Sequence, residues 1–181
     1  IASVSAGAAT ASGVQTIDAK GMTAMAGFID GHRHIMGGNA EMIGFLQRAV
    51  GYSLTGSTRE HCLFLLHGDG SNGKSTFVEA LRYVFGDYAR NTRPETFMER
   101  KESAIPNDVA ALDGARFVTA SESKEGAKLD EGMIKTVTGG DVVSARFMQK
   151  EFFDFLPRFK LWFCTNHKPV IRGTDEGIWR R

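Results

Sequence analysis

The sequence has few of the features that mark secreted, membrane-spanning or strongly basic proteins. Its two cysteines, Cys62 and Cys164, both lie in apolar runs, which indicates buried thiols in a reducing cytoplasm and no disulfide framework. No stretch approaches the roughly 18 apolar residues that a membrane helix needs, and no secretory signal is evident. The formal net charge is only +1, so any binding of nucleic acid requires a local patch.

The overall composition is ordinary for a globular protein, but it changes once along the chain. The 181 residues are 42% hydrophobic and 24% charged, and they suffice for one core, or for a core with an appendage. Residues 1–40 are mostly small and weakly charged, whereas residues 41–181 carry the strongly patterned segments. We therefore expect an N-terminal appendage, residues 1–40, and one folded domain, residues 41–181. The chain stops at Arg181 within a charged segment, so we expect this domain to be truncated.

The most informative stretch reads HGDGSNGKST and runs from His67 to Thr76. It matches the phosphate-loop pattern, in which a glycine is followed after four residues by Gly-Lys-Ser or Gly-Lys-Thr. The apolar run at residues 62–66 precedes it and is typical of a buried parallel strand, and residues 77–85 follow it with apolar side chains at helical spacing. A strand, a glycine loop and a helix are the context that this pattern requires. We therefore expect a site for a nucleoside triphosphate.

The residue types of this loop suit phosphate chemistry. Gly68, Gly70 and Gly73 let the backbone turn tightly and aim N–H groups at phosphate oxygens, and the helix that begins near Lys74 adds the positive end of its dipole. Lys74 is expected to reach the β- and γ-phosphates, and the Ser75 hydroxyl to bind Mg²⁺. The alternative is a chance Gly/Ser-rich turn before a helix. The residues predicted to bind the nucleotide are Gly68, Asp69, Gly70, Ser71, Asn72, Gly73, Lys74, Ser75 and Thr76.

A second apolar run, residues 116–121, leads directly to Glu122. Phosphate-loop enzymes place an acidic residue after such a strand, where it holds Mg²⁺ or polarises the attacking water. We expect Glu122 to have this role, with Ser121 available to the magnesium ion and Glu125 in reserve. The alternative is that Glu122 merely caps or solvates the end of a strand.

The other segments complete an α/β pattern. Helices are expected at residues 41–52, at residues 107–112 with Asn107 as a cap, and at residues 129–137. Residues 91–106 are polar and charged, which indicates a solvated surface loop. The expected fold is a three-layer α/β sandwich with a mostly parallel sheet.

The last third of the chain is expected to contain a hairpin and one more buried strand. Residues 142–155 have the pattern of two strands joined by a polar tip, with Arg146 and Lys150 on or near it. These cations could grip a DNA backbone, or they could belong to a solvated turn. Residues 159–166 are an apolar run that ends in Asn166, whose amide could orient the water that attacks the γ-phosphate.

Within the first forty residues, the run AGFIDGHRH contains His32 and His34. It resembles the start of the metal-dependent amidohydrolase barrel, in which such a strand presents two histidines to a catalytic metal. A barrel needs roughly 200 residues or more, whereas this chain turns to the phosphate-loop pattern after residue 40. We expect no working hydrolase, but a poorly packed amidohydrolase-like segment joined to another protein by fusion, recombination or misassembly.

From about residue 43 onward, the chain resembles the helicase domain of superfamily III, specifically the phage and plasmid primase-helicases related to the poxvirus primase-helicase. The resemblance rests on the ordered segments GDGSNGKST, FVTASESKEG, TGGDVVSARFM, FKLWFCTNHKP and RGTDEGIWRR. It implies an AAA+-like P-loop fold that hydrolyses ATP with Mg²⁺. It also implies a hexameric ring that translocates on single-stranded DNA in phage replication, in the cytoplasm of a bacterial or phage-infected cell and without a membrane.

The resemblance also implies roles in ATP hydrolysis. The loop from Gly68 to Thr76 matches the first nucleotide motif, and Glu122 matches the acidic end of the second. The acidic pair usual in the second motif is reduced here to Ser121-Glu122. Asn166 matches the sensor asparagine of the family.

Two further roles concern DNA and a neighbouring subunit. The hairpin around Arg146 and Lys150 matches a hairpin of the family that points into the channel of the ring and touches the DNA backbone. Arg180 or Arg181 would be the arginine finger, supplied to the ATP of a neighbour. Two alternatives stay open beside the helicase: an amidohydrolase fragment, which predicts bound zinc, and a non-catalytic module that binds ATP or mediates assembly without turnover.

Overall fold

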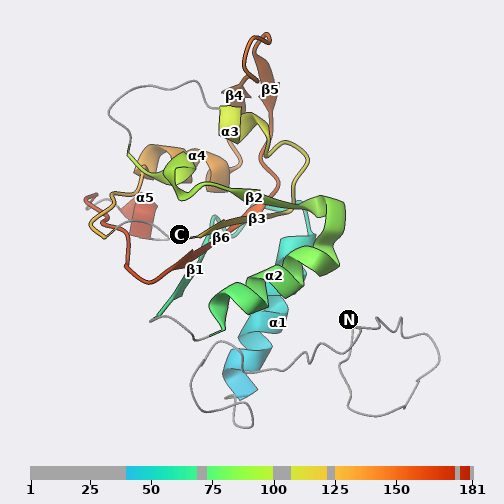
Figure 1. Ribbon diagram of the computed structural model, residues 1–181, viewed down its shortest axis with the longest axis vertical. Coiled ribbons are helices and arrows are strands. Elements are labelled where there is room, and N and C mark those ends of the chain that lie inside the picture. The colour runs from blue at the N-terminus through green and yellow to red at the C-terminus, as the bar shows by residue number, and fades with distance from the viewer. Residues whose placement is uncertain (1–39, 69–72, 100–106, 122–124, 174–175, 180–181) are drawn as a thin grey trace, which may run out of the picture.

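The structure is a computed structural model that describes residues 40–68, 73–99, 107–121, 125–173 and 176–179 (Figure 1). Several residues singled out above lie outside these ranges, namely His32, His34, Asp69, Gly70, Ser71, Asn72, Glu122, Arg180 and Arg181. Among the described helices, none is both long and apolar enough to span a membrane.

A four-stranded parallel sheet forms the centre of the molecule (Figure 1). Its strands are β1 (Phe64–His67), β2 (Ala89–Thr92), β3 (Phe117–Ser121) and β6 (Lys160–Thr165). They lie side by side in the order β1-β6-β3-β2, and every neighbouring pair is parallel. Parallel neighbours require crossover connections, which here carry the helices. The predicted α/β class with a parallel sheet is confirmed.

Both faces of this sheet are covered, as the uninterrupted apolar run of β6 requires. Successive side chains of a strand point to opposite faces. Leu161 and Phe163 accordingly belong to one hydrophobic cluster, whereas Trp162 and Cys164 belong to another. The molecule therefore has two core layers, one on each side of the sheet.

Helices α1 (Ala40–Leu54) and α2 (Lys74–Phe85) cover one face (Figure 1). Trp162 lies at the centre of this layer, with its ring 5.5 Å from that of Phe117, and its indole N–H donates to the Ser53 hydroxyl at 2.9 Å. Because Ser53 belongs to α1, this bond ties the helix to the sheet and satisfies a buried donor that would otherwise cost about 1–3 kcal/mol. Both helices were predicted from their apolar spacing.

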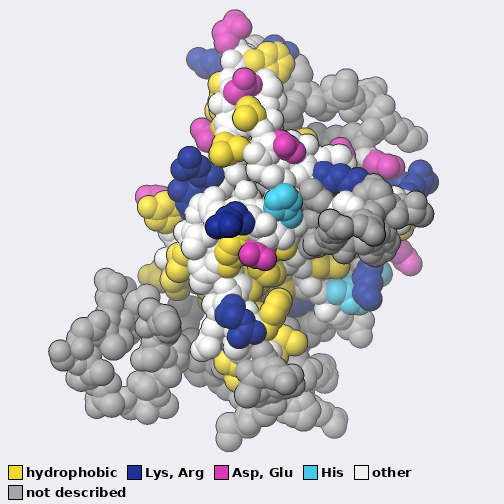
Figure 2. Space-filling model, turned by 180° about the vertical axis from the view of Figure 1, so that it is seen from behind, with side chains coloured by type: hydrophobic (Ala, Val, Ile, Leu, Met, Phe, Trp, Pro, Cys, Tyr) yellow, Lys and Arg dark blue, Asp and Glu magenta, His cyan; other side chains and the backbone are white. Residues whose placement is uncertain are grey.

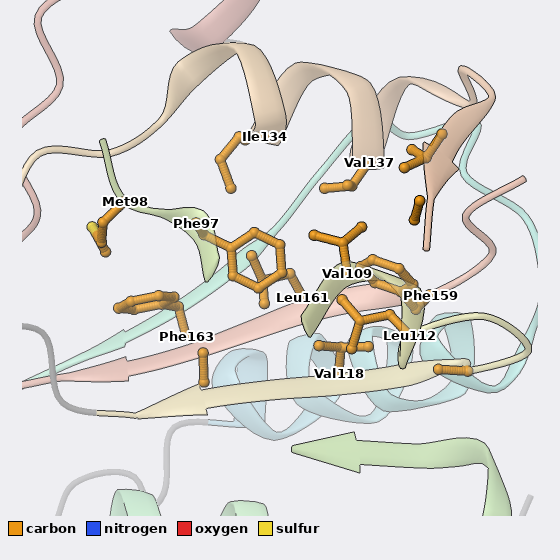
Figure 3. Packing of buried hydrophobic residues seen from close by; sticks show 14 of the residues in the cluster. Phe97, Met98, Val109, Leu112, Val118, Ile134, Val137, Phe159, Leu161 and Phe163 are labelled. Atoms are coloured by element: carbon orange, nitrogen blue, oxygen red, sulfur yellow. The ribbon is translucent and has the colours of Figure 1, made fainter. Parts of the chain in front are cut away.

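The other face carries α3 (Asn107–Ala110), α4 (Glu131–Gly139), α5 (Glu176–Trp179) and the 3₁₀ turn η2 (Pro94–Phe97). The hydrophobic cluster between these elements and the sheet is the larger of the two, and it contains most of the buried aliphatic side chains. Figure 3 shows the side chains that fill the space between α4 and the sheet, among them Phe97, Val118, Ile134, Val137 and Leu161.

Local signals in the sequence explain where the helices begin and end. The Asp130 carboxylate accepts the N–H of Met133 at 2.9 Å and so caps α4. Gly140 ends the same helix with φ 83°, in the left-handed region that favours glycine. α2 passes into the 3₁₀ turn η1 (Gly86–Tyr88) before β2 begins.

The predicted hairpin is present as β4 (Val143–Ala145) and β5 (Phe153–Phe155), an antiparallel pair. It projects from the molecule beyond α3 and α4 (Figure 1). Its base is anchored because Val143, Ala145 and Phe155 join the larger core cluster. The base of the hairpin is therefore continuous with the core.

The prediction of a solvated loop over residues 91–106 is wrong for its first part. The segment begins with the end of β2 and continues through η2. Phe97 is 0% exposed, and Met98 forms a β-bridge with Leu129. The charged neighbours Arg93 and Glu95 are exposed. Because of these polar neighbours, the sequence did not indicate that the apolar side chains of Phe97 and Met98 are buried. Residues 100–106 lie outside the described part of the chain.

Candidate functional site

The carboxyl ends of β1, β3 and β6 meet at one edge of the sheet. In the register, His67 of β1 lies opposite Thr165 of β6, and Ser121 of β3 lies opposite Cys164 of β6. The N–H of Gly68 donates to the Thr165 carbonyl at 3.4 Å, which extends the pairing one residue past β1. Ligands of parallel sheets bind at the carboxyl ends of strands. We refer to this region as the carboxyl edge.

α2 begins at the carboxyl edge, directly after the glycine loop. Gly73 precedes the helix with φ 80° and ψ 0°, a conformation that side chains other than glycine rarely adopt. Its carbonyl accepts the N–H of Phe77 at 2.9 Å and so opens the helical ladder. Ser75 and Thr76 are exposed on the first turn. The N–H groups of such a turn favour an anion, and α2, with 12 residues, is long enough to contribute its dipole.

Lys74, the first residue of α2, is only 7% exposed. Its ammonium group donates to the Gly68 carbonyl oxygen at 2.6 Å. The side chain therefore folds back from the start of the helix to the end of β1. Burial of an ammonium group costs free energy unless hydrogen bonds or opposite charge compensate it. A lysine held in this position is suited to an anionic ligand.

The Cys164 thiol lies near both Lys74 and Ser121. It is 3% exposed, and burial raises its pKa to about 11, while the Lys74 charge and a hydrogen bond with Ser121 oppose the rise. Lys74 from α2 and Ser121 from β3 thus act on the same thiol. The structure therefore places Lys74, predicted to bind phosphate, near Ser121, the serine that was expected to be available to the magnesium ion. Cys62, also predicted to be buried, is only half-buried.

Asn166 follows β6 and is exposed at the carboxyl edge. The turn around it is held by Thr165, which is 1% exposed. The Thr165 hydroxyl donates to the His167 carbonyl at 2.6 Å and accepts the His167 N–H at 3.1 Å. Both bonds enclose Asn166, so its backbone is fixed relative to the strand. The sequence indicated Asn166, whereas the supporting role of Thr165 became visible only in the structure.

The residues predicted for magnesium are described in part. Ser75 and Ser121 lie at the carboxyl edge, Glu122 lies outside the described residues, and Glu125, the reserve candidate, is exposed. In the part of the chain that the structure describes, no three His, Cys, Asp or Glu side chains gather where they could hold a metal ion. Magnesium usually keeps several waters and needs only one or two protein ligands beside phosphate.

The residues predicted to bind DNA belong to the hairpin that projects beyond α3 and α4 (Figure 1). Arg146 is half-buried, and its guanidinium carbon lies 4.7 Å from the centre of the Phe152 ring. Lys150 is exposed, and its backbone N–H donates to the Phe147 carbonyl at 3.0 Å. Arg146 and Lys150 are therefore close in the fold, on opposite sides of one turn.

One contact that sequence reasoning missed fixes the chain between Asn166 and α5. Glu131, at the start of α4, accepts the backbone N–H groups of Arg172 at 2.7 Å and of Gly173 at 2.6 Å with one carboxylate oxygen. A methyl group at position 173 would overlap this carboxylate, so glycine permits the close approach. The partners are 41 and 42 residues apart in sequence, and no local pattern predicts such a contact.

Several viral proteins are similar in sequence to this chain over most of its length. "Putative helicase L207/L206" of Acanthamoeba polyphaga mimivirus is 34% identical over 130 residues, which are 71% of this chain and 14% of that protein. "Putative helicase 184R" of Invertebrate iridescent virus 6 is 31% identical over 134 residues, 70% of this chain and 14% of that protein. "Putative primase C962R" of African swine fever virus is 26% identical over 126 residues, 68% and 13% respectively. The chain thus spans only a small part of these relatives.

A solved structure and a sequence family complete the comparison. "The apo structure of NrS-1 C terminal region (305-718)" resembles the present fold with a TM-score of 0.60 and 12% identity, over 85% of this chain and 37% of that one. At this identity the likeness concerns the fold alone. The sequence model of the family described as "Family of unknown function (DUF5906)" matches residues 66–181, which include the glycine loop, the carboxyl edge and the hairpin. The chain belongs to this DUF5906 family.

Proposed function

We propose that this chain is the ATP-hydrolysing module of a replicative DNA helicase, with an AAA+-like P-loop fold. The observation that carries the proposal is the position of Lys74. Its buried ammonium group lies at the start of α2, against the Gly68 carbonyl, where β1 ends beside β6. A buried cation, a helix N-terminus and a glycine in the left-handed conformation together suit the phosphates of ATP.

The proposed roles follow from this arrangement. Lys74 binds the terminal phosphates and neutralises the negative charge that develops as the phosphoryl group passes to water. Asn166 orients that water from the end of β6. Ser75 and Glu122 would hold Mg²⁺, which supplies further charge neutralisation when it is bound. The exposed Ser75 hydroxyl, next to Lys74 on the first turn of α2, fits such an ion.

The helicase part of the proposal is supported by the relatives and by the hairpin. The relatives are named as helicases and a primase. The family model spans residues 66–181, which include Lys74 and the hairpin. We propose that Arg146 and Lys150 bind single-stranded DNA during viral or phage-type replication. Identical subunits would assemble as a ring, in which Arg180 or Arg181 reaches the ATP of a neighbour.

The experiment that tests this function measures ATP turnover by the full chain with Mg²⁺, with and without single-stranded DNA. We expect turnover that DNA stimulates. Asn166→Ala should lower kcat about 100-fold, the usual effect of removing one group that acts on the transition state, with a smaller effect on KM. Gln47→Ala, which removes an exposed amide from α1, is the matched control.

Three other results would contradict the proposal in distinct ways. ATP binding without turnover would favour a non-catalytic module that binds ATP or mediates assembly. ATP turnover that DNA does not stimulate would support an ATPase but not a helicase. Zinc-dependent hydrolysis lost in His32→Ala would favour the amidohydrolase alternative.

A further inference from the structure

The tip of the hairpin, residues 146–152, exposes three large apolar side chains. Phe147 is 44% exposed, Phe152 57% and Met148 78%. Figure 2 shows hydrophobic side chains at the surface of this projection, beside acidic and basic ones. Exposure of large apolar side chains to water costs free energy, so three of them on one projecting turn indicate a binding surface. Phe147 contacts Phe153 and Phe152 contacts Arg146, so the two exposed rings lie on different faces of the hairpin.

The hairpin tip is held in one conformation. The Phe147 ring stacks on the Phe153 ring with centroids 6.0 Å apart and planes inclined by 23°. The N–H of Met148 donates to the Asn107 side-chain oxygen at 3.0 Å. The sequence had suggested that this side chain caps its own helix, whereas in the structure it holds the hairpin. The bond between Lys150 and Phe147 closes the turn. A preformed surface pays less ordering entropy when it binds a ligand.

Phe152 carries a cation against its ring. The Arg146 guanidinium carbon lies 4.7 Å from the ring centre, yet Phe152 stays 57% exposed. An exposed ring next to a guanidinium group combines the two contacts that single-stranded nucleic acids offer, stacking for the base and ion pairing for the phosphate.

The charges of the hairpin cannot by themselves account for affinity toward a phosphate backbone. Over residues 143–155, the positive charges of Arg146 and Lys150 are balanced by the negative charges of Glu151 and Asp154. Non-specific attraction to a phosphate backbone depends on net positive charge and weakens quickly with salt. A hairpin of zero net charge with exposed aromatic rings requires a second source of affinity.

We propose that the hairpin tip is a base-stacking surface for single-stranded nucleic acid. Phe147 and Phe152 stack on unpaired bases, while Arg146 and Lys150 contact the flanking phosphates. The inference rests on the proposed helicase function and adds the bases to its contacts with the DNA backbone. Stacking tolerates any sequence, because every base has an aromatic face. A protein partner fits less well, since a stable protein interface uses roughly 20–30 residues a side and residues 143–155 are fewer.

The test compares two oligonucleotides of equal length and charge, one of deoxythymidine and one whose sugars carry no base. The full chain is expected to bind the first about 10- to 100-fold more tightly, the range that one or two stacked bases provide. Phe147→Leu and Phe152→Leu should each remove at least about 5-fold of this preference and leave the affinity for the abasic strand unchanged. Tyr88→Leu removes an aromatic side chain that is also 57% exposed, from η1, and should change neither affinity.

Equal affinity of the unmodified chain for the two oligonucleotides would overturn the proposal. So would variants that weaken both oligonucleotides to the same extent. Self-association that is lost in Phe152→Leu, with unchanged DNA binding, would assign the tip to a protein contact. Phe152→Leu keeps the test valid if Phe147→Leu loosens the hairpin, because the stack on Phe153 is intact in it. ATP binding that still depends on Lys74 would show that only the stacking inference had failed.

Discussion

The Lys160 ammonium group donates to the Thr55 carbonyl oxygen at 2.6 Å and lies 4.3 Å from the centre of the Tyr52 ring. Lys160 is the first residue of β6, at the end of the sheet opposite the carboxyl edge, and it is 1% exposed. Burial lowers the pKa of this ammonium group from 10.5 to about 8, with a smaller contribution from the charge of Arg116. The contact joins the end of α1 to the sheet and makes stability depend on pH.

We expect the free energy of unfolding to rise between pH 8 and pH 9. Through this interval the folded chain loses most of its remaining Lys160 proton, whereas the unfolded chain keeps the proton up to about pH 10.5, so a rise in pH favours the folded state. The gain should be at most about 1 kcal/mol over this pH unit, measured by urea denaturation. Above pH 9 the trend should weaken, because the raised pKa of the Cys164 thiol, about 11, favours the unfolded state as pH rises.

Lys160→Met is the control for this prediction. It keeps an unbranched side chain of nearly the same length and removes the group that titrates, so the rise between pH 8 and pH 9 should disappear. An equal rise in the variant would show that another group titrates.

Gly173→Ala should destabilise the chain through Glu131. The added methyl group would force the carboxylate away and break its two bonds to the backbone, at a cost of about 1–3 kcal/mol. Thermal or urea denaturation of a double-mutant cycle tests the cause. In a Glu131→Ala background, Gly173→Ala should cost almost nothing further, whereas additive costs would contradict this explanation.

Lys150→Ala should weaken binding to single-stranded DNA and lower its dependence on salt. Loss of one phosphate contact reduces the slope of log K against log salt by about 0.7 for a single strand. Titrations at several salt concentrations measure this slope. Arg48→Ala removes a positive charge from α1, at the far end of the molecule from the hairpin (Figure 1), and should leave the slope unchanged. An unchanged slope in Lys150→Ala would remove Lys150 from the interface.

Those parts of the fold with strong local signals could be predicted from the sequence. β6 is a continuous apolar run, α4 has Asp130 as its cap and Gly140 at its end, and the glycine loop lies between a strand and a helix. β2 could not be predicted, because it is a short edge strand whose residues Arg90 and Asn91 are exposed. Polar side chains on an edge strand give no alternating apolar pattern.

The candidate site was predictable to a similar extent. Lys74 and Asn166 follow from motifs, and parallel strands necessarily bring their carboxyl ends to one edge. The supports of the site, Thr165 and Glu131, could not be predicted. Thr165 acts through a turn geometry that its residue type does not specify, and Glu131 acts through a contact across 41 residues.

The central claim is that the carboxyl edge binds ATP through Lys74, and equilibrium binding of ATP with Mg²⁺ tests it most directly. Lys74→Ala should lower the affinity about 100-fold, which corresponds to about 2.7 kcal/mol. Arg82→Ala removes a positive charge from the same helix and breaks an exposed ion pair with Glu79, of little value for stability, so it should bind ATP as the unmodified chain does. Equal ATP affinities in all three proteins would contradict the assignment of this edge as a nucleotide site.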